Sequence, residues 1–74
     1  MADDKESVVV TIADSHLTRI KSVADELRDA GLEVRQVLST SGIISGKAAP
    51  TARHALEAVP GVIAVEPDEE MRAI

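Results

Sequence analysis

The order of apolar patterns along the chain constrains its fold more than any other feature. Short β-branched or alternating stretches predict four strands, at residues 7–13, 32–38, 43–48 and 62–65. Residues 14–31 predict a helix, because apolar side chains from Leu17 to Leu27 recur at three- and four-residue intervals. Residues 50–58 predict a second, shorter helix. The predicted order is therefore strand, helix, strand, strand, helix, strand.

Glycine and proline residues mark where these elements end. Gly31 supplies the left-handed residue that stops the first helix. Pro50 fits the first turn of the second helix, because the amide hydrogen that it lacks has no partner there. Pro60 and Gly61 favour a type II turn before the last strand. Gly46, inside the third strand, predicts either a bulge or a close approach of another backbone.

This order predicts a particular α+β architecture. Two right-handed crossovers place both helices on the same side of the sheet. We therefore expect the ferredoxin-like βαββαβ fold, with a four-stranded antiparallel sheet in the order 4-1-3-2 and two helices on one face. A single domain is expected to span residues 1–74, with a flexible lead-in at residues 1–6 and an extended C-terminal tail at residues 67–74.

One face of such a sheet has no helices over it. Depending on the strand register, this open face is expected to carry Val9, Thr11, Glu33, Arg35 and Val37. Valines among charged side chains on an uncovered sheet favour a docking surface. An ordinary scatter of exposed apolar residues explains the same pattern, and the fold alone does not decide between the two interpretations.

Composition argues against several classes of function. The chain has 74 residues and no cysteine, so neither disulfides nor thiolate metal sites are available. A net charge of −5 disfavours binding to nucleic acid, and the absence of Phe, Tyr and Trp removes the platforms on which bases stack. No apolar run is long enough to span a membrane, and the first residues lack the pattern of a signal peptide. A cytoplasmic location is expected, with secretion left open.

Residues 14–16 place Asp, Ser and His in succession, but a catalytic triad brings these groups together from separate segments. We expect Asp14 or Ser15 to cap the first helix instead. His16 and His54 are the only histidines, and neither has a second ligand at metal-binding spacing. Both are therefore interpreted as surface side chains.

Two further motifs fail on their spacing. The glycines and lysine of residues 42–47 lack the spacing and the hydroxyl of a phosphate-binding loop. The carboxylates of residues 66–70 lack the spacing and the glycine of an EF-hand. The sequence thus predicts a protein that is not an enzyme and that needs no cofactor or metal.

The last part of the chain, ARHALEAVPGVIAVEPDEEMRAI, resembles the C-terminal half of subtilisin propeptides and of the small stand-alone protease inhibitors built on the same domain. The matching features are a short helix containing Leu56, then Pro60, and then a hydrophobic strand at residues 62–65. A Val-Glu-x-Asp motif follows at residues 65–68, and six residues separate it from the end of the chain, a spacing typical of these propeptides.

The resemblance implies a partner and a mode of binding. In that family the open sheet face packs on two surface helices of a subtilisin-like serine protease, and acids at the positions of Glu66 and Asp68 cap those helices. The tail enters the active-site cleft as a product-like strand. Here the tail would comprise Met71, Arg72, Ala73 and Ile74. The implied function is to inhibit the protease, to assist its folding, or both.

A second hypothesis needs no protease. A ferredoxin-like module can use an exposed sheet face for regulation, for oligomerisation or for binding a small ligand. A homodimer through the open sheet is one form of this hypothesis. The resemblance at the C-terminus favours the inhibitor, but both hypotheses depend on the same face.

Overall fold

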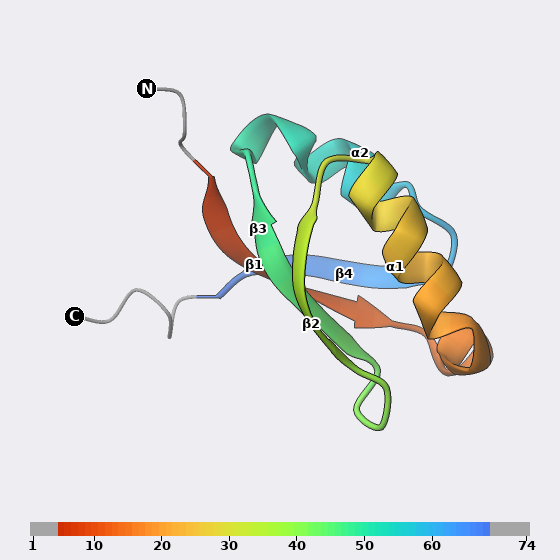
Figure 1. Ribbon diagram of the computed structural model, residues 1–74. Helices are drawn as coiled ribbons and strands as arrows, with labels where there is room; N and C mark the ends of the chain where they lie inside the picture. The colour runs from red at the N-terminus through yellow and green to blue at the C-terminus, as the bar shows by residue number, and fades with distance from the viewer. Residues whose placement is uncertain (1–4, 69–74) are drawn as a thin grey trace.

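The computed structural model describes residues 5–68 (Figure 1). Its strands are β1 (Glu6–Ile12), β2 (Glu33–Leu38), β3 (Ile43–Ala48) and β4 (Val62–Pro67). Each helix is entered through a 3₁₀ segment, and the segments are η1 (Asp14–Arg19), α1 (Ile20–Asp29), η2 (Pro50–Ala52) and α2 (Arg53–Glu57). The predicted order of strands and helices is confirmed. Glu6 and Pro67 belong to strands, so the sheet reaches into both segments that were predicted to be flexible or extended.

The four strands form one antiparallel sheet in the order β2-β3-β1-β4. This is the predicted order read from the other edge. β1 lies between β3 and β4, so it is a central strand of the sheet. β2 and β4 are the edge strands.

The core lies between one face of the sheet and the two helices. Its most deeply buried side chains are Val10, Leu27, Ile44 and Leu56, which come from β1, α1, β3 and α2. They belong to one cluster, so both helices cover the same face of the sheet (Figure 1). The buried side chains within residues 5–68 are all aliphatic, and each large one removed from water contributes about 1.5–3 kcal/mol.

Gly31 and Gly61 both have the positive φ that their predicted roles require, Gly31 at the end of a helix and Gly61 in a turn. Gly31 has a φ of 116°, and the amide of Leu32 donates to the carbonyl of Leu27 at 2.9 Å, which closes the helix with a Schellman motif. Gly61 has a φ of 95°, and the amide of Val62 donates to the carbonyl of Val59 at 3.1 Å. The predicted type II turn is therefore confirmed.

The predicted cap of the first helix is wrong. Ala13 occupies the N-cap position of η1, and neither Asp14 nor Ser15 caps this segment through its side chain. The chain enters the helix through a 3₁₀ turn, in which the amide of His16 donates to the carbonyl of Ala13 at 2.8 Å. The hydroxyl of Ser15 lies 3.0 Å from Nδ1 of His16 instead.

β2 does not alternate as predicted, because a bulge interrupts its pairing with β3. Val34 pairs with Gly46 and Gln36 pairs with Ser45, so Arg35 is an extra residue in β2. The close approach predicted at Gly46 is confirmed, since a Cβ added there would lie 2.3 Å from the carbonyl oxygen of Glu33. The bulge itself lies in the neighbouring strand, opposite this glycine.

Candidate docking face

The open face of the sheet presents three rows of side chains, each running from β2 through β3 and β1 to β4. The first row contains Glu33, Lys47, Ser7 and Asp68. The second contains Gln36, Ser45, Val9 and Glu66, and the unpaired Arg35 lies beside it on the same face. The third contains Leu38, Ile43, Thr11 and Ala64. The face is therefore polar and charged at one end and mainly apolar at the other.

The apolar end of the open face combines half-buried and exposed side chains. Thr11, Ile43 and Ala64 are half-buried by their neighbours within the sheet. Leu38 is exposed at the edge of β2, and Ile63 is the most exposed large apolar side chain of the described residues, at 64%. A partner that packs here would cover apolar surface that no helix of the chain covers.

The carboxylates of Glu66 and Asp68 lie on the open side of β4, two residues apart. Glu66 pairs with Val9 and is exposed. The amide of Asp68 donates to the carbonyl of Ser7 at 2.9 Å, which extends the pairing of β4 with β1 to the last described residue. Alternate residues of a strand point to the same face, so both acids face outward at the end of the sheet where β4 finishes.

β4 is fixed by α2 as well as by β1. Nη2 of Arg53 donates to the carbonyl of Val65 at 3.1 Å. Val65 itself is buried against the helices and pairs with Val10. The part of β4 that carries the two acids is consequently held from both neighbouring elements.

Four of the five residues predicted for the open face lie there: Val9, Thr11, Glu33 and Arg35. The placement of Val37 is wrong. Val37 pairs with the buried Ile44 and packs against the core. The reason is the extra residue at Arg35, because it shifts the alternation of β2 by one position and turns Val37 toward the helices.

The bulge also brings residues to the open face that the alternation pattern missed. Simple alternation along β2 would place Gln36 on the same face as Val34, but Gln36 pairs with Ser45 on the open side. A signal for this was present in the sequence. Val34 and Val37 can both reach the core only if an extra residue separates them, and Gly46 indicates where the neighbouring strand accommodates it.

The predicted tail residues Met71, Arg72, Ala73 and Ile74 lie outside the described part of the chain. Within residues 5–68, no three His, Cys, Asp or Glu side chains are grouped so that they could hold a metal ion. A phosphate-binding loop leads from a strand into a helix. Residues 42–47 instead comprise the end of a loop and most of strand β3. None of the described helices is long and apolar enough to cross a membrane.

No family model, curated protein or solved structure gives a significant match to this chain. Any proposal about its function therefore depends on the geometry of the open face and on the sequence of the C-terminal segment.

Proposed function

We propose that this chain is a ferredoxin-like domain that binds and inhibits a subtilisin-like serine protease. The observation that carries the proposal is the position of Glu66 and Asp68, two outward carboxylates at the end of β4 on the open side of the sheet. The βαββαβ order, with both helices on one side, supports the fold assignment. The C-terminal resemblance supports the choice of partner.

The two acids suit the N-termini of helices on a partner. The first amides of a helix have no partners within the helix, and the helix dipole makes that end positive. Each carboxylate placed there contributes about 0.3–1 kcal/mol, and up to about 2 kcal/mol where the site is partly buried. In the proposed complex, Glu66 and Asp68 cap two surface helices of the protease.

The rest of the open face serves as the anchor in this proposal. Its central side chains, Val9, Thr11 and Ser45, are short, so a helix of the partner can pack close to the sheet. The apolar row at the far end adds surface that leaves water on binding. The charged row at the near end lies beside the point where the tail begins.

The tail acts as a decoy substrate. After Asp68, six residues remain, and an extended segment of that length spans roughly 20 Å. We propose that Met71 fills an apolar pocket of the cleft, that Ala73 and Ile74 occupy the positions next to the scissile bond, and that Arg72 points mainly outward. Because Arg53 and Ser7 fix the end of β4, the tail starts from a defined point, which lowers the entropy lost on binding.

A titration of a purified subtilisin with the intact chain tests this proposal. We expect loss of peptidase activity that added substrate reverses, since the tail occupies the substrate cleft. A serine protease of the chymotrypsin fold serves as a control and should retain its activity. A subtilisin that keeps full activity at high micromolar concentrations of the chain would contradict the proposal.

A regulatory, oligomerisation or small-ligand-binding module is the second candidate, and the polar hollow at the charged end of the open face favours its ligand-binding form. In its simplest form, two copies associate through their open faces. Sedimentation over a range of protein concentrations separates the candidates. A dimer that resists dilution supports the second candidate, and a monomer that inhibits subtilisin supports the first.

A further inference from the structure

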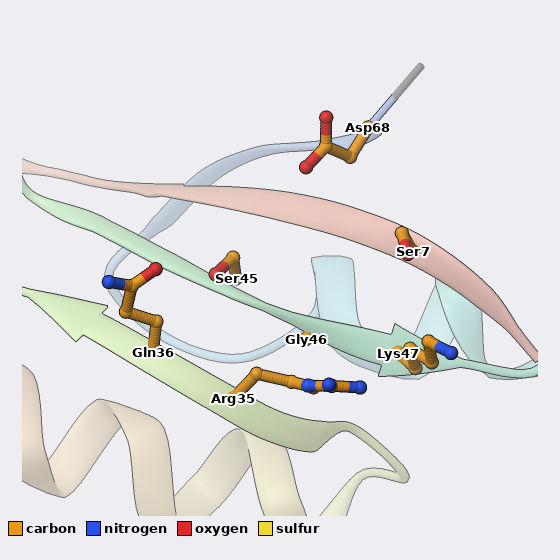
Figure 2. A pocket seen from close by; sticks show the side chains of 7 residues that line it. All are labelled: Ser7, Arg35, Gln36, Ser45, Gly46, Lys47 and Asp68. Carbon is orange, nitrogen blue, oxygen red and sulfur yellow. The ribbon is translucent and has the colours of Figure 1, made fainter. Parts of the chain in front are cut away.

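The charged end of the open face contains a hollow of about 340 Å³ (Figure 2). Its lining residues are Ser7, Arg35, Gln36, Ser45, Gly46, Lys47 and Asp68. Apart from Asp68 and from Gly46, which has no side chain, every residue of this lining can donate hydrogen bonds through a guanidinium, an ammonium, an amide or a hydroxyl group. The hollow is thus rich in donors, although the chain as a whole is acidic.

The hollow is a product of the bulge in β2. In a regular strand, Arg35 and Gln36 would point to opposite faces of the sheet. The extra residue places both on the open side, opposite Ser45 (Figure 2). Gly46 permits this arrangement, because any side chain there would collide with the backbone of Glu33. Bulges that redirect side chains are frequent beside binding sites.

The two cations of the hollow have no ion pair within residues 5–68. The salt bridges in this part of the chain are Lys5 with Glu33 and Arg28 with Asp25. The nearest acid on β2, Glu33, is engaged by Lys5 at 3.6 Å. Among the described residues, no acidic side chain therefore forms an ion pair with Arg35 or Lys47, and both line the hollow. Asp68 lies on the opposite rim, across β3 and β1 (Figure 2).

We infer that this hollow binds the phosphate group of a small molecule. The two negative charges of the phosphate are neutralised by Arg35 and Lys47. The phosphate oxygens that these cations leave free accept hydrogen bonds from Ser7, Ser45 and Gln36. A phosphate fits better than a carboxylate, because its larger number of acceptor oxygens matches a guanidinium fork, an ammonium and several neutral donors. The inference is independent of the inhibitor proposal, since it involves neither the tail nor a protease, and it gives the ligand-binding form of the second candidate a ligand class.

The test is a titration of the isotopically labelled chain with inorganic phosphate, followed by the amide resonances at constant ionic strength. We expect saturable shifts that centre on Arg35, Gln36, Ser45 and Lys47, with a dissociation constant in the millimolar range for so open a site. Acetate should bind more weakly at the same concentrations. Equal binding of acetate would overturn the assignment to phosphate.

Substitutions locate the site. Arg35→Gln and Lys47→Gln should each weaken phosphate binding about fivefold or more, since each removes a charge-assisted hydrogen bond. Arg19→Gln and Lys21→Gln are matched controls, because they remove the same charges from exposed positions on η1 and α1. Asp68→Asn should strengthen binding severalfold, because it removes the carboxylate on the opposite rim.

Two further results would overturn the inference. One is a set of shifts that never saturates and is spread over the whole surface. The other is an equal loss of binding in the control variants and in the variants of the hollow. None of the four substituted cationic side chains belongs to the buried core. An unchanged dispersion of the amide resonances will show that each variant is folded. The protease is absent from this experiment, so its result is independent of the inhibition test.

Discussion

Along β1, the helix-covered face of the sheet carries Val8, Val10 and Ile12, and the open face carries Ser7, Val9 and Thr11. The covered side chains are at most 5% exposed, whereas those on the open face are half-buried at every position. The side chains on the two sides of this one strand thus differ in their exposure to solvent. We conclude that the covered face determines stability and that the open face is available for binding.

The largest effect is expected from a cavity on the covered side. Leu27 is fully buried, and Leu27→Ala should lower the free energy of unfolding by about 2–5 kcal/mol. That loss is comparable with the whole stability of a small domain, about 5 kcal/mol. Urea denaturation followed by circular dichroism measures it. Val9→Ala on the open face should cost much less, and equal losses would remove the distinction between the faces.

The second prediction concerns the close approach of β3 to the backbone of β2 at Gly46, on which the shape of the open face depends. A methyl group at position 46 would lie 2.3 Å from the carbonyl oxygen of Glu33, so Gly46→Ala should destabilise the fold by about 1–3 kcal/mol. Ser45→Ala, at the neighbouring position, should change the stability by less than about 0.5 kcal/mol. A stable Gly46→Ala variant with unchanged amide shifts in β2 would show that the bulge does not need this glycine.

A smaller effect, in binding alone, is expected from the outward acids. Replacing Glu66 and Asp68 together by alanine should weaken binding to subtilisin by about 1–2 kcal/mol, because two partner helices lose their caps. Unfolding should be almost unaffected, since neither side chain is buried in the core. Glu57→Ala, an exposed acid on α2, is the control. The control removes one charge and the double variant removes two, so a loss in the double variant of only about twice the control's loss would mean that the acids act through net charge alone.

The smallest effect concerns the link between α2 and β4. Arg53→Met keeps most of the side-chain stem but removes the donor to the carbonyl of Val65, and it should lower stability by about 1 kcal/mol. Arg28→Met removes an exposed pair with Asp25 and should change stability by about 0.5 kcal/mol or less. Thermal unfolding of both variants under the same conditions measures the difference, and equal midpoints would mean that the hydrogen bond to Val65 adds nothing.

The order of the elements could be predicted because each signal is local. Apolar periodicity identified the strands and the longer helix, and Gly31 and Gly61 marked where the chain reverses. The helix cap could not be predicted in the same way. A polar residue before a helix can cap it or bond to its neighbour, and the 3₁₀ entry selected the second alternative at Ser15.

The open face was predicted only in part, because its composition depends on how two strands pair. Alternation along β2 places Val37 on the open side, and the bulge reverses that placement. The hollow was missed for the same reason: Arg35, Gln36 and Lys47 come together only when β2 carries an extra residue opposite Ser45. A pattern within one strand does not contain that information.

The most direct test of the proposed function is to compare the intact chain with a variant that lacks Met71 to Ile74, using inhibition of subtilisin as the measurement. We predict that the shortened chain retains its fold by circular dichroism and loses about a hundredfold or more in potency, equivalent to nearly 3 kcal/mol of binding free energy. A shortened chain that inhibits as strongly as the intact one would contradict the proposal that the open face anchors the protein while the tail occupies the cleft.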